Sequence, residues 1–329
     1  MFSGALRRFG PATATASLVV WSSQHRGEGQ SSCVTTTTTS TSTITTPKTW
    51  DCPPKLDDML LKDKSGHFSG INRPTAGKRS DGELPNGDAP LQLYSLATPN
   101  GKKLGILCEE LGIPYDAHTV NIMKEEQFTS GFVKMNPNSR IPSAVDKDGP
   151  GGQPILLWES AAIMWYLADK HRRFLPQEPH LRQEVLAWLF WQMSGQAPYT
   201  STFGHFMKYA PMDHGIRDYA LQRYGLIMMT QMDVLDKALE GKTWLVNDEY
   251  TIADMCCYPW FELLRSGYFN VTTPEGKKIN AMKFINPGRW KNLSAWADRI
   301  KARPAVQRGI KINAKFGVHH IWSERKFDV

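Results

Sequence analysis

The residues of this chain that are best suited to ligand chemistry lie within positions 136–171. Ile141-Pro142 precedes a short apolar segment, and an X-Pro bond at such a place is a candidate for the cis isomer, which can expose the backbone of Ile141 to an extended ligand. Farther along, Glu159-Ser160 opens an apolar helical pattern. We expect Ser160 to cap that helix, so that its hydroxyl and the first free N–H groups bind a small carboxylate. Together these features predict a pocket for a peptide-like ligand with a carboxylate at one end.

The elements that must position this pocket alternate between strand and helix. The periodicity predicts strands at 91–95, 115–121, 143–146 and 155–158, and helices at 100–111, 128–135 and 160–171. One β-α-β unit ahead of a hairpin and a covering helix leaves few arrangements that obey handedness and adjacency. Residues 91–175 are therefore predicted to form an α/β thioredoxin-like domain.

The second half, residues 180–313, is dominated by helical periodicity and predicts an all-α domain. Residues 188–191 read WLFW, so we expect their helix to be central and buried. Thr251 and Asp254 have the spacing of a capping box at the start of another helix, which should kink at Pro259. A last helix is expected at 292–303 before Pro304.

The regions outside these two domains are polar. Residues 1–27 are rich in Arg and Ser and contain no acidic residue, which is typical of a mitochondrial or plastid transit peptide. A disordered extension without an address, in a cytoplasmic protein, is the alternative. A Ser/Thr tract follows, so residues 1–49 are expected to stay outside the fold. Residues 50–90 are interpreted as an extended arm, and residues 314–329 as a solvated basic tail.

Composition excludes several functional classes. The formal charge is +7, but the excess lies at the two ends of the chain and no basic stripe is interleaved with aromatic residues, so nucleic-acid binding is not expected. The apolar run 18–21 is too short to span a membrane. The five cysteines form no CxxC and no zinc spacing, so neither a metal nor a disulfide framework is indicated. We expect Cys108 and Cys256-Cys257 to be buried small hydrophobes.

Several segments resemble one family closely. They read LQLYSLATPNGKKLGILCEELGI, EEQFTSGFVKMNPNSRIP, ESAAIMWYLADK, WLFWQ, FGHFMKYAP and DEYTIADM. With the thioredoxin-like and helical halves, they are similar to cytosolic-type glutathione transferases of the nu class, the glutathione-dependent disulfide-bond oxidoreductases. The resemblance runs from about Trp50 to Asn313 and implies a homodimer with glutathione as co-substrate and no metal.

The resemblance also implies which residues hold glutathione. Glu159 and Ser160 would bind its γ-glutamyl end. The backbone of Ile141 would pair with the cysteinyl portion, with Arg140 alongside, and Gln127 would contact the glycyl end.

Four further residues match family positions near the ligand. Thr98 and Asn100 would approach the thiol, where other classes place a Tyr, Ser or Cys. Asn72 on the arm and Arg223 in the helical half would also reach bound glutathione. Without the resemblance, Arg223 would be interpreted as a solvated helix charge and Thr98 as part of a turn.

Thiol chemistry agrees with this reading. Donors around a thiol stabilise its thiolate, the form that attacks a disulfide. Oriented glutathione can therefore carry out exchange without a protein cysteine. We expect a disulfide reductase, with peroxidase activity toward organic hydroperoxides and weak conjugation of electrophiles. A non-catalytic glutathione-binding regulatory protein on the same fold is the alternative, and the polar residues at the expected site positions speak against it.

Overall fold

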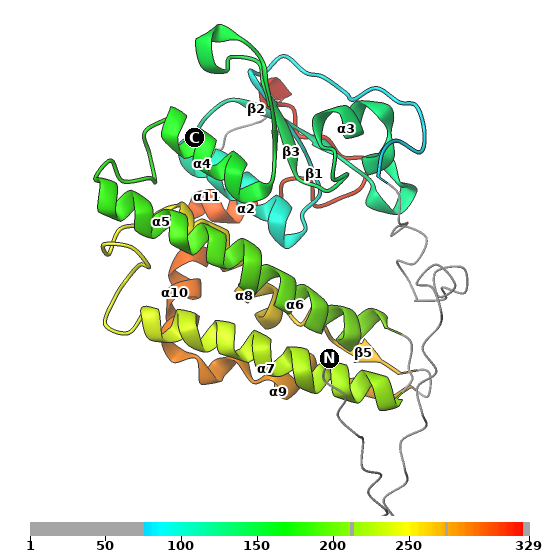
Figure 1. Cartoon of the computed structure of the whole chain (residues 1–329), viewed down its shortest axis with the longest axis vertical. Coiled ribbons are helices and arrows are strands. Elements are labelled where there is room, and N and C mark those ends of the chain that lie inside the picture. The colour runs from blue at the N-terminus through cyan, green and yellow to red at the C-terminus, as the bar shows by residue number, and fades with distance from the viewer. Residues whose placement is uncertain (1–75, 211–213, 274–275, 325–329) are drawn as a thin grey trace, which may run out of the picture. The chain divides into compact units, whose positions relative to one another are not determined.

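The computed structural model describes residues 76–210, 214–273 and 276–324. The amino-terminal extension and Asn72 lie outside these residues. Within them, a mixed sheet with helices is followed by a largely helical half, as Figure 1 shows. The predicted fold class, a thioredoxin-like domain joined to a helical domain, is therefore confirmed.

The first half is built on a four-stranded sheet. Its strands are β1 (Leu91–Ser95), β2 (Tyr115–Thr119), β3 (Ser143–Asp146) and β4 (Ile155–Trp158), in the spatial order β2-β1-β3-β4. Its helices are α2 (Pro99–Leu111), α3 (Ser130–Met135) and α4 (Ser160–Lys170), with short 3-10 turns at Ile122–Lys124, Glu126–Phe128 and Pro150–Gly152. Strand β1 is parallel to β2 and antiparallel to β3, with Leu91 opposite both Tyr115 and Asp146. The predicted β-α-β unit, hairpin and covering helix are all present.

Helix α2 begins and ends with ordinary capping chemistry. Thr98 lies at its N-cap in extended backbone, and the Thr98 hydroxyl accepts a hydrogen bond from Gly101 N at 3.3 Å. Pro99 occupies the first turn, where a missing N–H costs nothing. Gly112 ends the helix with a φ of 67°, in the left-handed region that glycine adopts without strain. These caps fix the residues at which α2 begins and ends.

The described part of the arm lies along the first domain. Arg79 N donates to Phe128 O at 2.8 Å, and its guanidinium lies 3.4 Å from the centre of the Phe128 ring. Nearby, Ser80 forms a parallel bridge with Thr129. Tyr94 in β1 donates its hydroxyl to Pro85 O at 2.7 Å. Residues 76–90 therefore follow a defined path across the α/β domain.

The second half is helical apart from a two-residue hairpin. Its elements are α5 (Pro179–Trp191), α6 (Ala197–Gly204), α7 (His214–Ala238), α8 (Ile252–Arg265), α9 (Ala281–Ile285), α10 (Lys291–Lys301) and α11 (Pro304–Gly309), with π-helical turns at Gln192–Gln196 and His205–Tyr209, 3-10 turns at Pro287–Arg289 and Trp322–Glu324, and strands β5 (Val271–Thr272) and β6 (Lys278–Ile279). Figure 1 labels the helices α5 to α11 and strand β5.

Helix α5 does not match its prediction. Only Val185 and Leu189 on this helix are buried, and Phe190 is 66% exposed. Trp188 and Trp191 are half-buried and pack edge to face with their ring centres 5.2 Å apart. The expectation of a central buried helix was wrong because the apolar residues of α5 serve two faces, of which only one meets the core.

Helix α8 is the buried helix of this half, and its predicted capping box is present. Thr251 accepts from Ala253 N at 3.2 Å, while the Asp254 carboxylate accepts from Thr251 N at 3.0 Å. Asp254 also accepts from Trp296 Nε1 at 2.8 Å and Leu245 N at 3.1 Å. Burial raises the pKa of Asp254 to about 6 despite these donors. Asp254 therefore joins α8 to α10 and to the loop that precedes α8.

Residues 314–324 do not form the solvated tail that was predicted for 314–329, since part of this segment is bonded to β2. His320 forms an antiparallel bridge with Ala117 in β2, and Trp322 N donates to Asp116 at 2.8 Å. Thr119 donates its hydroxyl to Val318 O. The prediction rested on charge, but β2 offers unpaired backbone groups along one side, and the segment satisfies them.

The stability of the protein should depend on pH because a buried histidine of β2 lies beside this docked segment. His118 in β2 is 2% exposed, its Nε2 lies 2.8 Å from Gln92 Oε1, and its Nδ1 has no partner. Burial, assisted by nearby His319, lowers the pKa of His118 to about 4, while Asp116 and Lys147 act in opposite directions. An unfolded histidine titrates near 6.5. Between these values the unfolded chain binds more protons, so stability should fall as the pH drops from 6.5 to 4.

We expect His118→Gln, which keeps a donor for Gln92, to lose part of that dependence. Melting temperatures measured by circular dichroism at steps between pH 4 and 7 would show it. The exposed His180→Gln serves as the matched control and should follow the unmodified chain. Equal slopes for all three proteins would contradict the assignment.

Candidate functional site

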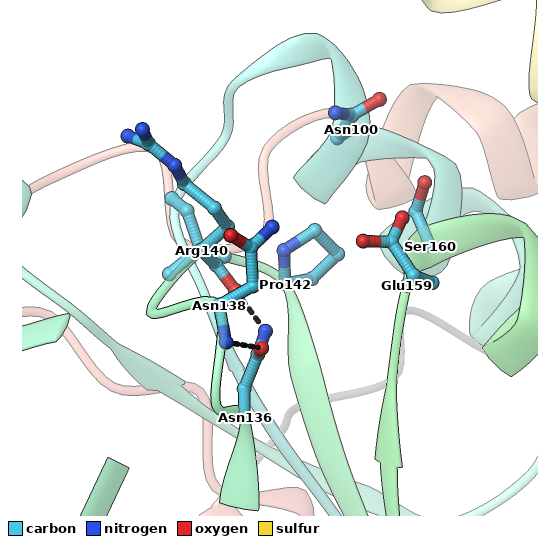
Figure 2. A pocket seen from close by; sticks show the side chains of 8 residues that line it. Asn100, Asn136, Asn138, Arg140, Pro142, Glu159 and Ser160 are labelled. Atoms are coloured by element: carbon cyan, nitrogen blue, oxygen red, sulfur yellow. Dashed lines mark hydrogen bonds between the residues drawn. The ribbon is translucent and has the colours of Figure 1, made fainter. Parts of the chain in front are cut away.

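A cavity of about 200 Å³ opens where three elements of the first domain meet. Asn100 comes from the first turn of α2, the loop between α3 and β3 supplies a run of residues, and the β4–α4 junction supplies two more. Figure 2 shows these side chains around the opening. The cavity is lined by Asn100, Asn136, Asn138, Arg140, Ile141, Pro142, Glu159 and Ser160. It is thus mostly polar, with three side-chain amides, one guanidinium and one carboxylate.

Five of the predicted site residues line this cavity: Asn100, Arg140, Ile141, Glu159 and Ser160. The Ile141–Pro142 peptide bond is cis, as the sequence indicated. The ligand-binding roles of these residues stay predictions, but the fold does bring together positions that lie up to sixty residues apart in the chain.

Three other predicted residues do not line the cavity. The Thr98 hydroxyl caps α2 and lies 3.4 Å from Leu96 O. Gln127 is buried, with its Nε2 3.4 Å from Ile122 O and its Oε1 without a partner. Arg223 is an exposed residue of α7. Asn72 falls outside the described residues.

The predicted cap at Ser160 is wrong by one residue. Helix α4 begins at Ser160, and Glu159 holds the cap position with a φ of 66° and a ψ of 117°. That φ is unusual for a residue with a side chain and costs on the order of 1 to 3 kcal/mol. Ile163 N donates to Glu159 O at 3.0 Å and helps to hold this geometry. Residues in such a conformation cluster at binding sites, and this one places both Glu159 and Ser160 at the cavity.

A tryptophan from the helical half fixes the Asn100 amide. Trp260 Nε1 in α8 donates to Asn100 Oδ1 at 3.0 Å. Because an indole N–H can only donate, the amide oxygen must face Trp260, and the amide nitrogen is left for the cavity. In Figure 2 that nitrogen is turned toward the side of Arg140, with the oxygen pointing away. Asn100 therefore presents a hydrogen-bond donor to any ligand.

No sequence pattern predicted a role for Asn136, which is 1% exposed. Its Nδ2 donates to Arg140 O at 2.6 Å and to Ser143 Oγ at 3.1 Å, and its Oδ1 accepts from Asn138 N at 2.9 Å. Figure 2 shows the bonds to Asn138 and Arg140 as dashed lines. Asn136 thus shapes the loop that carries half of the lining. Its only sequence signal is the Asn-Pro-Asn run, which reads as an ordinary turn.

Lys103 in α2 is a second residue that sequence reasoning missed. It is completely buried, and its Nζ lies 3.2 Å from Ser160 Oγ and 2.6 Å from Gln192 Oε1. Gln192 belongs to the helical half, so Lys103 links both halves behind the cavity. Lys103 lies within the predicted helix 100–111, where a lysine gives no hint of such a position.

The cysteines of the described residues are free and buried, as predicted. They are Cys108, Cys256 and Cys257. Burial raises the pKa of the Cys256 thiol and raises that of Cys257 further. A buried thiol with a raised pKa is a poor nucleophile, so none of the three is suited to disulfide exchange.

The described residues contain neither a membrane-spanning helix nor a metal-binding group of acidic, Cys or His side chains. No helix there is long and apolar enough to cross a membrane. Among the same residues, no group of three or more His, Cys, Asp or Glu side chains could hold a metal ion.

Two protein-family models match the chain at its two halves. The glutathione S-transferase amino-terminal domain matches residues 98–170, and the glutathione S-transferase carboxy-terminal domain matches residues 227–304. Relatives match far more of the chain. The disulfide-bond oxidoreductase YghU of Escherichia coli is 41% identical over 276 residues, which are 82% of this chain and 87% of that protein.

Solved structures agree with this result. A glutathione transferase YghU from Streptococcus pneumoniae, complexed with glutathione, is 40% identical with a TM-score of 0.72, covering 81% of this chain and 98% of that one. A glutathione transferase from Pseudomonas putida, with one glutathione disulfide bound per subunit, is 37% identical with a TM-score of 0.62, covering 68% and 92%. The chain described here belongs to the glutathione S-transferase family of enzymes.

The role of Asn136 in shaping the cavity can be tested by stability. Asn136→Ala removes a buried amide that donates to Arg140 O and Ser143 Oγ, so we expect the free energy of unfolding to drop by about 2 kcal/mol. Denaturant titration followed by tryptophan fluorescence would measure it. Asn138→Ala, which keeps the backbone N–H that bonds Asn136, is the matched control and should change stability little. Equal stabilities for the two variants would contradict this role.

Proposed function

We propose that this protein is a glutathione-dependent disulfide reductase in which glutathione, and no protein cysteine, supplies the attacking sulfur. The single observation that carries the proposal is the cavity itself. It places an amide donor, the backbone of residues next to a cis-proline and the start of a helix around one cavity. The known structures with glutathione or glutathione disulfide bound support this ligand class for the present chain.

In the proposed binding mode, Glu159 and Ser160 hold the γ-glutamyl end of glutathione. The backbone of Ile141 pairs with the cysteinyl portion, and Arg140 stands beside it. That placement directs the sulfur toward the first turn of α2. There the Asn100 amide nitrogen, oriented by Trp260, donates to the developing thiolate and lowers the thiol pKa.

The reaction then balances with two glutathione molecules. The thiolate of the first attacks one sulfur of the substrate disulfide, forming a mixed disulfide and releasing the other sulfur as a thiolate that takes a proton from water. A second glutathione thiolate attacks the glutathione sulfur of that mixed disulfide and releases the second substrate thiol. One substrate disulfide is reduced to two thiols, and two glutathione molecules are oxidised to one glutathione disulfide.

The same site supports a peroxidase activity in our proposal. A glutathione thiolate attacks the terminal oxygen of an organic hydroperoxide and breaks the O–O bond. The rest of the hydroperoxide leaves as an alkoxide, which takes a proton and becomes an alcohol. The glutathione sulfenic acid formed reacts with a second glutathione to give glutathione disulfide and water. We expect conjugation of electrophiles to be weak, because Thr98 and Asn100 occupy the positions where other classes of the family place a thiol-activating Tyr, Ser or Cys.

The proposed mechanism assigns unequal weight to Thr98 and Asn100. Asn100→Ala removes a donor aimed at the sulfur, and we expect kcat/KM for glutathione-dependent reduction of a small mixed disulfide to fall by about a hundredfold. Thr98→Ala should cost less, because the Thr98 hydroxyl caps α2 and does not line the cavity. Trp260→Phe keeps an aromatic side chain but removes the indole N–H that holds the Asn100 amide. We expect an intermediate loss of about tenfold in kcat/KM. The pKa of the thiol of bound glutathione should rise, which thiolate absorbance would measure.

A variant in which every cysteine is replaced by Ala or Ser provides the control. Retained turnover in that protein would exclude a cysteine nucleophile. Wild-type rates in folded Asn100→Ala and Thr98→Ala proteins would overturn the mechanism. Binding of glutathione without any turnover would instead favour a regulatory binding protein.

We further propose a homodimer. Large apolar side chains are exposed on the described surface, among them Trp158 on β4 at 42%, Phe190 on α5 at 66%, and Tyr219 and Leu226 on α7 at 70% and 61%. Burying them against a second copy would remove this apolar surface from water. Light scattering should give twice the chain mass of 37.1 kDa, and Phe190→Glu should shift it toward the monomer. A monomeric wild-type protein would contradict the proposal.

The compartment is also a proposal. The Arg- and Ser-rich composition of residues 1–27 favours delivery to mitochondria, with plastids or the cytoplasm as alternatives. A fluorescent reporter fused behind residues 1–50 would distinguish these destinations.

A further inference from the structure

The side chain of Lys103 forms a buried cation between the two halves. Its Nζ lies 2.6 Å from Gln192 Oε1, 3.2 Å from Ser160 Oγ and 3.4 Å from Met193 Sδ. Each of these three atoms accepts hydrogen bonds, and together they match the three N–H donors of an ammonium group. The side chain is fully excluded from water.

No carboxylate of the described residues forms an ion pair with this ammonium group. Acidic side chains appear in every ion pair of the described residues, and none of those pairs includes Lys103. Neutral acceptors replace only part of the hydration that a charge loses on burial. A second group of the same cluster, Gln192 Nε2, is buried without a partner. The positive charge of Lys103 is therefore only partly compensated by its neighbours. Lys103 lies directly behind Ser160, which lines the cavity.

We propose that Lys103 is a positioning residue that makes the Ser160 end of the cavity selective for a carboxylate. Because Ser160 Oγ accepts from Lys103, the Ser160 hydroxyl proton must point elsewhere. In the structure it reaches only Met193 Sδ at 3.5 Å, and a thioether is a weak acceptor. A carboxylate in the cavity is a far better one.

Three effects then act on the same anion. It receives the Ser160 hydroxyl proton, it meets the free N–H groups of the first turn of α4, and it stands in the field of the buried ammonium. That field is strong because little water separates the charges. Glu159 lines the same end of the cavity and would meet an ammonium group, so the pair of residues fits the zwitterionic end of an amino acid.

This inference rests on the proposed function for the identity of the ligand. The carboxylate would be the α-carboxylate of the γ-glutamyl residue of glutathione. The decisive probe is therefore a pair of non-reactive ligands, S-methylglutathione and the analogue in which γ-aminobutyrate replaces the γ-glutamyl residue, which lacks only that carboxylate.

The experiment measures the affinities of both ligands by isothermal titration calorimetry for the full chain and for Lys103→Gln and Lys103→Met. We expect the unmodified chain to prefer S-methylglutathione by at least about tenfold, and both variants to lose most of that preference while binding the analogue as before. Lys102→Gln, one residue earlier on α2 with the same change in net charge, is the matched control and should keep the preference.

Thermal stability gives a second readout that a merely structural lysine would not produce. Removing an uncompensated buried charge should raise the melting temperature of the unliganded protein, while the rise in melting temperature on adding S-methylglutathione should shrink. A Lys103→Gln protein that fails to fold would contradict the uncompensated charge and overturn the proposal. An unchanged ligand preference in folded Lys103→Gln, or no preference in the unmodified chain, would also overturn it.

These outcomes are distinct from a failure of the proposed function. Ligand preference is measured without turnover, so a protein that reduces no disulfide can still show the carboxylate selectivity. Conversely, an active reductase whose Lys103 variants keep the preference would retain the proposed function and lose this inference.

Discussion

Helix α2 approaches α11 so closely that the two backbones touch. A Cβ added at Gly105 would lie 2.4 Å from Gly309 O, and one added at Gly309 would lie 2.6 Å from Ile106 N. Two ion pairs flank this crossing, Arg303 with Glu110 at 2.6 Å and Arg308 with Glu109 at 2.7 Å. Ten of the thirteen residues of α2 are buried. Because α2 cannot shift without breaking this contact, everything that it carries is held in place.

Helix α2 carries two residues that contact both halves of the protein. Its first turn places Asn100 at the cavity and in contact with Trp260. Its second turn places Lys103 between Ser160 and Gln192. The polar lining comes from the α/β half, and the helical half contributes Trp260, which orients Asn100, and Gln192, which accepts a hydrogen bond from Lys103. A site of this kind is rigid where a ligand binds and depends on the domain interface for its geometry.

The sequence predicted the local features of this arrangement well and the long-range ones poorly. Alternation gave the four strands, and the Thr251 to Asp254 spacing gave the capping box, because both patterns depend on neighbours in the chain. The cis bond before Pro142 was predicted for the same reason. The Ser160 cap was misplaced since a residue other than glycine with a positive φ, here Glu159, has no sequence signature.

The partners of Asn136 lie within seven residues of it, but two other missed residues are defined by distant partners. Trp260 acquires its role from a residue 160 positions earlier, and Lys103 from one 89 positions later. A single sequence lists such residues as ordinary members of amphipathic helices. Arg223 shows the opposite case, since only a family resemblance singled it out and the structure places it on an exposed face of α7.

The bridge between His320 and Ala117 has a consequence for the behaviour of the protein in concentrated solution. Strand β2 is the last strand on its side of the sheet. An uncovered edge strand offers unpaired N–H and C=O groups to the strands of other molecules, which is a common start of aggregation. Residues 318–322 occupy that edge, with Trp322 N bonded to Asp116 and His319 Nδ1 to Thr119 N. The end of the described chain thus covers this edge of the sheet, and loss of its contacts would leave the edge open to self-association.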